Sequence, residues 1–298
     1  MNHRIIARLD IKGPNLVKGI RLEGLRALGP VERFARHYYE SGADELIYAD
    51  VVASLYNRNS LAEIISRTAS QIHIPLTVGG GTRTVQDINT VLRAGADKVS
   101  LNTAAIARPE LIREAARIFG SSTIVVTIEV IRQPDGRYLA YTDNGREATG
   151  LEAVSWARRA EELGAGEIVL TAVDRDGTGS GFDLEIVAQV AQAVSIPVIA
   201  HGGAGQVQHV RSVLTQGGAS AVALASMIHY DAISRPGVRL APGAPGPAAG
   251  EGNFEFLRSG RGFSRVTPLG LAAIKAELRA AGVPCRPGAA GSEAKSDG

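Results

Sequence analysis

Cysteine is almost absent from the sequence: Cys285 is the only one, so the chain can form no internal disulfide. The chain also lacks an apolar run of the ~20 residues that a membrane-spanning helix requires. Its first residues, MNHRIIARLD, contain no apolar segment of signal-peptide length. From these absences we expect a cytoplasmic protein that does not enter a membrane.

Charge of one sign is not concentrated in any segment. The chain has 32 Lys and Arg and 30 Asp and Glu, scattered among one another, and a formal net charge of +2. This pattern indicates no nucleic-acid footprint and leaves small anions as candidate ligands. The spacings HExxH and CxxC are absent, the histidines are dispersed, and GxGxxG does not occur in a nucleotide-binding context. We expect no metal and no redox cofactor.

Short apolar runs rich in β-branched residues alternate with amphipathic helical patterns along the chain. Eight such runs are present: RIIARLDI, DELIYADVV, IPLTVGGG, KVSLNTAA, STIVVTIEV, EIVLTAVD, IPVIAHGG and AVALASMI. The patterns between them, such as VERFARHYYESG and LEAVSWARRAEELG, end at glycine, as helices often do. Eight strand and helix units in regular alternation predict an α/β fold of the (β/α)8 TIM-barrel type rather than an open doubly wound sheet.

The two halves of the chain resemble each other. The segment that starts at Ile74 matches the one that starts at Ile196 at an offset of 122 to 123 residues, and SGADELIYAD matches LGAGEIVLTA at an offset of 122. This period predicts a barrel built from two similar half-barrels. We expect a single barrel over residues 1–286, with an insertion at about 234–265, and a disordered tail at 287–298.

Loops rich in Gly, Ser, Thr and Asn follow several predicted strands. Glycine lets the backbone approach a ligand closely, and N–H groups at the start of the next helix favour an anion. Because such loops recur at equivalent places in both halves, they predict two phosphate sites at opposite rims of the barrel mouth. One site would comprise Gly81, Asn102 and Thr103, and the other Gly177, Gly203 and Ser226. The alternative is that these glycines only make tight turns.

Acidic residues lie near the middle of the predicted mouth. They are Asp10, Asp50, Glu129, Asp174 and Asp176. Asp10 and Glu129 end the first and fifth predicted strands, so half-barrel symmetry places them across the axis from each other as a candidate acid-base pair. Lys18 is the candidate cation that would tune one of them. For Asp50 and Asp174, capping of the next helix is the alternative.

Several motifs in order resemble the cyclase subunit of imidazole glycerol phosphate synthase. They include RIIARLDIKG, LVKG, GADELIYAD, RAGADKVSLNTAA, GAGEIVLTAVDRDGTGSGFDLE and IPVIAHGGAG, within residues 3–233 and 267–286. The resemblance implies a (β/α)8 barrel that takes ammonia from a partner glutaminase. It also implies conversion of a bis-phosphorylated ribulosyl-formimino-aminoimidazole carboxamide nucleotide to imidazole glycerol phosphate and aminoimidazole carboxamide ribotide, in histidine biosynthesis.

The resemblance also implies roles for particular residues. Asp10 falls on the first catalytic aspartate, and Lys18 falls on the lysine of the first loop. Further substrate-binding positions are Asp50, Gly81, Asn102, Thr103, Thr171, Asp176, Gly177, Gly203 and Ser226. A ring of two bases and two acids around the ammonia entrance falls on Arg4, Glu45, Lys98 and Glu167. Without the resemblance, these four charges would be interpreted as ordinary ion pairs at the strand N-termini.

Three residues near the predicted strand ends depart from the family pattern. Glu129 stands where an aspartate is usual, Arg8 where cysteine is common, and His201 where serine is usual. Glutamate is one methylene longer than aspartate, and a misplacement of about 1 Å can cost ~100-fold in rate. Two alternatives follow: a paralogue that uses channelled ammonia to amidinate a sugar nucleotide in surface-polysaccharide synthesis, and a non-catalytic scaffold that activates the glutaminase.

The expected insertion has two compositionally different parts. Residues 241–252 are rich in Pro, Gly and Ala and would form a flexible linker without a role. The following part is aromatic and basic, and the alternative hypothesis is that it covers the mouth or contacts a partner. It contains Phe254, Phe256, Arg258, Arg261 and Arg265.

Overall fold

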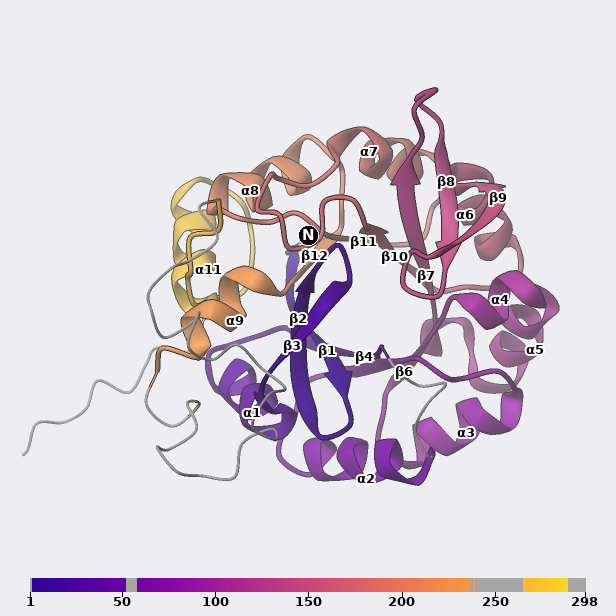
Figure 1. The fold of residues 1–298 in the computed structure, drawn as a ribbon, viewed down its shortest axis with the longest axis horizontal. Helices are drawn as coiled ribbons and strands as arrows, with labels where there is room; N and C mark the ends of the chain where they lie inside the picture. Colours follow the sequence, from indigo (N-terminus) through magenta and orange to yellow (C-terminus); the bar gives the residue numbers. More distant parts are fainter. Residues whose placement is uncertain (1, 52–57, 236–237, 239–264, 289–298) are drawn as a thin grey trace, which may run out of the picture.

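Parallel strands form a closed barrel in the computed structural model, which describes residues 2–51, 58–235, 238 and 265–288. In barrel order the strands are β1 (Arg4–Lys12), β4 (Glu45–Asp50), β5 (Leu76–Gly79), β6 (Lys98–Leu101), β7 (Ile124–Arg132), β10 (Glu167–Ala172), β11 (Val198–His201) and β12 (Ala221–Leu224). The circle closes because β12 pairs in parallel with β1. The predicted (β/α)8 architecture is therefore confirmed (Figure 1).

Helices follow the strands and form an outer layer around the barrel (Figure 1). They are α1 (Val31–Glu40), α2 (Arg58–Ala69), α3 (Val85–Arg93), α4 (Thr103–Ala107), α5 (Glu110–Phe119), the 3-10 turn η1 (Ser121–Thr123), α6 (Ala153–Glu162), α7 (Leu184–Ala193), α8 (Val207–Thr215), α9 (Ser226–Ala232) and α11 (Leu271–Ala280). Their starts are encoded locally. Thr84 and Asp87 form a capping box on α3, and the Asp183 side chain caps α7.

Each half of the barrel begins with a strand that is extended by antiparallel partners. In the first half these are β2 (Asn15–Ile20) and β3 (Glu23–Pro30), which follow β1; in the second they are β8 (Tyr138–Thr142) and β9 (Glu147–Glu152), which follow β7. The extension corrects the prediction that Asp10 and Glu129 end their strands. Asp10 pairs with Ala49 of β4 and with Val17 of β2, and Glu129 pairs with Thr171 of β10 and with Tyr141 of β8, so both residues lie inside their strands.

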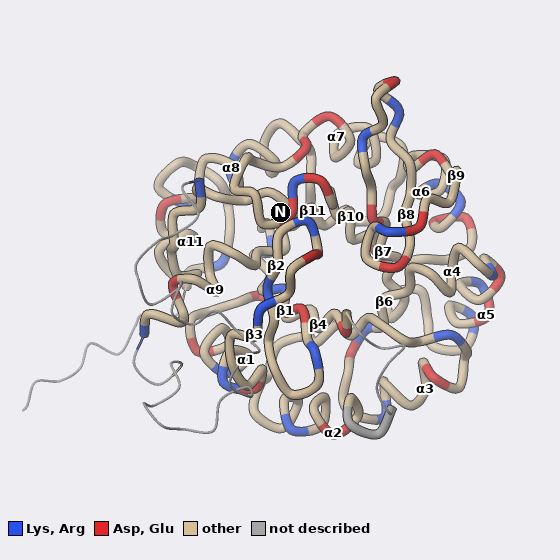
Figure 2. Tube along the Cα trace, viewed as in Figure 1, with Lys and Arg blue, Asp and Glu red and all other residues tan. Residues whose placement is uncertain are grey.

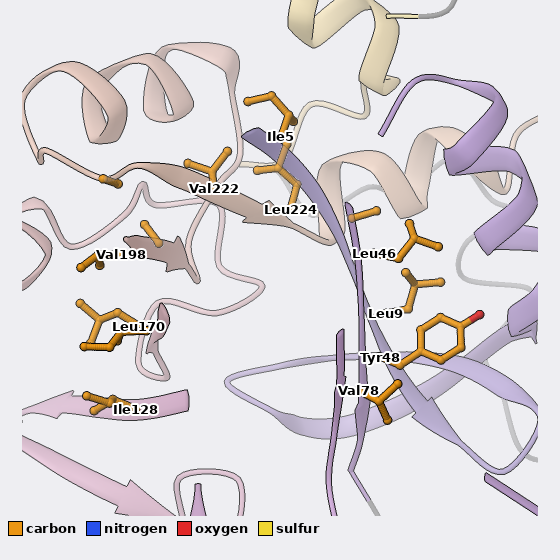
Figure 3. Packing of buried hydrophobic residues seen from close by; sticks show 14 of the residues in the cluster. Ile5, Leu9, Leu46, Tyr48, Val78, Ile128, Leu170, Val198, Val222 and Leu224 are labelled. Carbon is orange, nitrogen blue, oxygen red and sulfur yellow. The ribbon is translucent and has the colours of Figure 1, made fainter. Parts of the chain in front are cut away.

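Strand residues alternate between two separate apolar clusters. Side chains such as Leu9, Leu46 and Tyr48 lie together on the outer side of the strands, within the large cluster that also contains helix residues (Figure 3). A smaller cluster fills the inside of the barrel and comprises Ile6, Ile47, Val125, Val169, Ile199, Ala221 and Ala223. Since side chains on one face recur every two residues, the residues two positions before and after Ile6, Arg4 and Arg8, also face inward. The apolar inner cluster is therefore bordered by charged residues.

Beyond α9 the chain is described only in part. Most of the expected insertion, including Phe254, Phe256, Arg258 and Arg261, lies outside the described residues, as does most of the expected tail. The chain re-enters the described part at Arg265 beside the loops after β10 and β11. There the Thr267 N–H donates to the carbonyl of Gly205 at 2.8 Å.

Charged residues of both signs are interspersed around the rim (Figure 2). In the described part of the chain, no helix has the length and apolarity needed to cross a membrane.

A buried ion pair attaches the C-terminal helix α11 to the start of the barrel. The fully buried Lys275 Nζ lies 2.9 Å from Asp44 Oδ1 and donates to the carbonyl of Gly42 at 2.6 Å. The other Asp44 oxygen accepts the Ile5 N–H of β1 at 2.7 Å. This carboxylate therefore links α11 to β1, where the barrel closes.

Replacing Lys275 by Met is expected to destabilise the fold by about 3–5 kcal/mol, because it leaves the Asp44 carboxylate buried without its main cation. Urea unfolding followed by circular dichroism measures the change. Arg36→Ala, which breaks an exposed pair with Glu40, is the control and should leave the midpoint unchanged. A Lys275→Met midpoint equal to that of the control would contradict the assignment.

Candidate active site

A cavity of about 550 Å³ opens at the strand C-terminal face beside β4, β5, β6 and β7. Asp50, Gly81, Asn102, Thr103 and Glu129, five of the predicted site residues, line it. Its floor reaches down to Ile47 and Val169 of the inner apolar cluster. The residues of the first predicted phosphate site and one predicted catalytic acid, Glu129, therefore line the same cavity.

Glycine is required in the wall of this cavity. Gly80 has a φ of 104°, and a Cβ there would lie 2.5 Å from the carbonyl oxygen of Asp50. Gly81 follows with a φ of 67°. Both positions thus bring bare backbone to the rim above β5, as a phosphate contact requires.

The residues of the second predicted phosphate site lie on the other side of the mouth. Gly177, Gly203 and Ser226 follow β10, β11 and β12, whereas the first group follows β5 and β6. In the barrel order, β11 and β12 stand opposite β5 and β6. The structure therefore separates the two groups across the barrel axis, as the repeat predicted.

The β2–β3 hairpin packs against the loop after β10, which contains Gly177 of the second predicted phosphate site. Arg21 donates its N–H to the carbonyl of Asp176 at 2.8 Å. A Cβ on Gly177 would meet the carbonyl oxygen of Gly19 at 2.7 Å, so only glycine fits under the hairpin. A smaller cavity of about 320 Å³, lined in part by Lys18 and Gly19, lies between the hairpin and Tyr230.

Lys18, which the structure places in β2, is paired with a buried acid. Its Nζ lies 2.7 Å from Asp176 Oδ2, and both side chains are almost fully buried. Although burial acts to raise it, the pKa of Asp176 lies well below the usual range because Lys18 stabilises the carboxylate. Sequence reasoning offered Lys18 as a partner for Asp10 or Glu129, but the structure pairs it with Asp176.

His201 flanks the same carboxylate. Its Nδ1 bonds the carbonyl of Ala223 at 2.9 Å, and its Nε2 lies 3.4 Å from Asp176 Oδ1. Burial lowers the pKa of His201, and the nearby Arg8 charge lowers it further. The ring is therefore neutral at pH 7 and directs its Nε2 at Asp176.

The two predicted catalytic acids lie on opposite strands of the barrel and are both buried, Asp10 with 2% and Glu129 with 6% exposure. Glu129 Oε2 accepts the N–H of Gly145 at 2.8 Å. Burial raises the pKa of Glu129 to about 7, although the Gly145 N–H and the Arg8 charge act to lower it. A carboxyl with this pKa exchanges a proton readily near neutral pH.

Arg8 is a central site residue that the predicted site set omits. Its Nε donates to Asp10 Oδ1 at 3.0 Å, and its Nη1 donates to Thr171 Oγ1 at 2.9 Å. It also lines the large cavity. The signal was present in the sequence, because Arg8 precedes Asp10 by two residues and so faces the same side of β1.

A closed ring of ion pairs lies at the strand N-termini, on the face opposite the cavity. Arg4 bridges Glu45 at 2.5 Å and Glu167 at 2.9 Å, and Lys98 bridges the same two acids at 3.3 and 3.1 Å. The structure thus brings together all four predicted residues. We refer to Arg4, Glu45, Lys98 and Glu167 as the ion-pair ring.

The ion-pair ring and the cavity are separated by one layer of side chains. Ile47 and Val169, which line the cavity floor, follow Glu45 and Glu167 by two residues on the same strands. Within the described ranges, no group of three or more His, Cys, Asp or Glu side chains is placed to hold a metal ion.

Comparisons with known proteins cover this whole region. A family model described as a histidine biosynthesis protein matches residues 4–234. An imidazole glycerol phosphate synthase subunit HisF of Legionella pneumophila is 58% identical over 207 residues, which are 70% of this chain and 98% of that protein. HisF subunits of Alkaliphilus metalliredigens (strain QYMF) and Thermobifida fusca (strain YX) are 48% and 49% identical, each over 78% of this chain and 92% of the relative.

The raised pKa of Glu129 predicts a pH-dependent stability difference between wild type and Glu129→Gln. Between the ordinary value of 4.5 and about 7, the folded state keeps a proton that the unfolded state releases. Wild-type stability therefore falls as pH rises through this window, by about 3 kcal/mol in total for this group. The glutamine variant does not titrate, so it should gain this amount relative to wild type. Urea unfolding at pH 4.5, 6 and 8 checks it; a difference independent of pH would contradict the assignment.

Proposed function

Because this chain belongs to the HisF family of imidazole glycerol phosphate synthase subunits, we propose that it catalyses the ring closure of that synthase. The substrate would be the bis-phosphorylated ribulosyl-formimino-aminoimidazole carboxamide nucleotide, and the nitrogen donor would be ammonia. The products would be imidazole glycerol phosphate, aminoimidazole carboxamide ribotide and water.

One observation carries this proposal: the two glycine-rich groups stand across the mouth from each other, with Asp10 and Glu129 between them. A substrate with a phosphate at each end would place its middle over these two acids. Gly81, Asn102 and Thr103 would hold one phosphate, and Gly177, Gly203 and Ser226 the other. Asp50, Thr171 and Asp176, with Lys18 beside it, would complete the substrate site.

The chemistry requires proton transfer at more than one atom. Ammonia adds to the ribulosyl carbonyl, whose oxygen must take up protons before it leaves as water. The new nitrogen then attacks the formimino carbon, and the aminoimidazole nitrogen that departs must gain two protons to leave as an amine. A base must accept the protons that the ammonia nitrogen loses and the one that the methylene beside the former carbonyl loses when the imidazole ring becomes aromatic. Asp10 and Glu129 would serve as this acid-base pair.

We propose that a glutaminase subunit binds the strand N-terminal face and delivers ammonia at the ion-pair ring. Ile47 and Val169 support this route, because they both face the inner apolar cluster and line the cavity floor. Neutral ammonia can cross such an apolar layer, whereas ammonium would lose its hydration there.

The reaction can be tested without a glutaminase. Purified protein should convert the ribulosyl nucleotide with an ammonium salt, measured by the change in ultraviolet absorbance and by chromatography of both products. Asp10→Asn should lower kcat by about 10²–10⁴-fold, because it removes an acid-base group. Glu129→Asp should retain part of the activity, since it keeps the carboxyl but shortens it. Absence of turnover by well-folded wild type would refute the proposal.

If ammonia enters at the ion-pair ring, a change in the ring should affect turnover with glutamine more than turnover with an ammonium salt. With a cognate glutaminase present, Lys98→Met should lower glutamine-dependent turnover more than ammonium-dependent turnover, because added ammonium can reach the cavity from the open mouth. The ratio of the two rates is the readout, and Arg36→Ala, on the exposed face of α1, is the charge-matched control. An unchanged ratio would place the delivery route elsewhere. A scaffold role would be favoured instead if the protein stimulated the glutaminase, the ion-pair-ring variants did so as well as wild type, and no cyclised product formed.

A further inference from the structure

We propose that Arg8 is a positioning residue: its guanidinium holds Asp10 as the carboxylate and so leaves Glu129 as the carboxyl that carries the proton. The inference rests on the proposed function, since it assigns proton-transfer roles within that reaction. The supporting observation is that the barrel mouth contains three buried acids, Asp10, Glu129 and Asp176, but only two cations paired with them, Arg8 and Lys18.

Arg8 reaches across the inside of the barrel. It starts on β1 and donates to Thr171 on β10, and β12 and β11 lie between these strands in the barrel order. It also donates to Asp10 Oδ1 at 3.0 Å. A guanidinium held at both ends has one orientation, so its positive charge is fixed next to Asp10 at the cavity wall.

The charged and titratable groups around Arg8 come from several elements. They are Asp10 on β1, Lys18 on β2, Glu129 on β7, Asp176 after β10, His201 on β11 and His229 on α9. Lys18 is paired with Asp176 at 2.7 Å, and Arg8 is paired with Asp10. His201 is neutral at pH 7, because burial and Arg8 lower its pKa. Two cations thus neutralise two of the three acids.

Glu129 is the acid that remains. Among the described residues, no Lys, Arg or His lies within 4 Å of its carboxylate, which instead accepts the Gly145 N–H and interacts with the Asn102 side chain. A buried carboxylate without a paired cation is costly, so the site gains most by protonating this group. The pKa of about 7 agrees with this geometric argument.

Position 127 explains why the two acids differ. On β1 the residue two positions before the acid is Arg8, and on β7 the residue two positions before Glu129 is Thr127. Both precede their acid on the same inward face. Thr127 bonds Ser100 at 2.5 Å and supplies no charge. The paired position therefore places a cation beside Asp10 and an uncharged hydroxyl on the strand of Glu129.

A titration of the full chain without substrate tests the assignment. Infrared difference spectra are recorded against pH with the side-chain carboxyl carbon of glutamate ¹³C-labelled, and the spectrum of Glu129→Gln is subtracted. The wild-type midpoint should lie near pH 7. Arg8→Gln, which keeps hydrogen-bonding groups but removes the charge, should raise the midpoint by about one pH unit. Asp10→Asn removes a negative charge and should shift it in the opposite direction.

Arg8→Lys keeps the charge and should shift the midpoint less than Arg8→Gln does; it also serves if the glutamine variant folds poorly. Two results would overturn the proposal. One is an Arg8→Gln midpoint equal to that of wild type; the other is a shift of the midpoint in the same direction by Arg8→Gln and by Asp10→Asn. The basic limb of the kcat/KM profile, measured at constant neutral ammonia, should move with the midpoint in Arg8→Gln. Wild type that titrates as expected but shows no turnover refutes the proposed function and leaves the Arg8 assignment intact.

Discussion

The constraint on which this structure depends is that each charge inside the barrel must find a partner of opposite charge. Strand β1 directs Arg4, Arg8 and Asp10 inward, where water cannot solvate them well. Each charge is paired: Arg4 with Glu45 and Glu167 of other strands, and Arg8 with Asp10 on its own strand. A buried ion pair gives little net stability, but loss of one partner is costly. These pairings therefore restrict which register and which strand neighbours the barrel can adopt.

The same constraint divides the barrel interior into layers with different chemistry. Charges occur at the two ends, in the ion-pair ring and in the mouth, and the small apolar cluster lies between them. The layers alternate with the two-residue period of each strand, so a single β-strand such as β1 contributes to all of them. The two ends of the barrel therefore differ in chemistry. Under the proposed function, ammonia would pass from the ring toward the cavity, and the acids and glycine-rich loops of the mouth would hold the phosphorylated substrate.

The sequence was sufficient for the architecture because alternating patterns and an internal repeat are local signals that survive in the fold. The repeat also located the opposite glycine-rich groups, since strand ends of a barrel fall on known faces, whereas the ion-pair ring was located through the family resemblance. The sequence did not predict the antiparallel extensions β2–β3 and β8–β9, whose short runs resemble loops. For the same reason it could not give the partner of Lys18. The β2–β3 hairpin places Lys18 beside Asp176, and that pairing depends on tertiary packing.

The two half-barrels show how a duplicated frame produces unequal acids. Both halves place an acid at the same inward position of an extended strand, so the repeat alone would give two similar carboxyls. Their neighbours break the symmetry. Asp10 has Arg8 two residues before it, whereas Glu129 has Thr127 there and interacts with the Gly145 N–H and the Asn102 side chain, which carry no charge. Acid-base catalysis near neutral pH needs one group that holds a proton and one that has lost it. In the proposed mechanism, the difference between Arg8 and Thr127 at equivalent positions would supply that inequality without disturbing the frame that holds both acids.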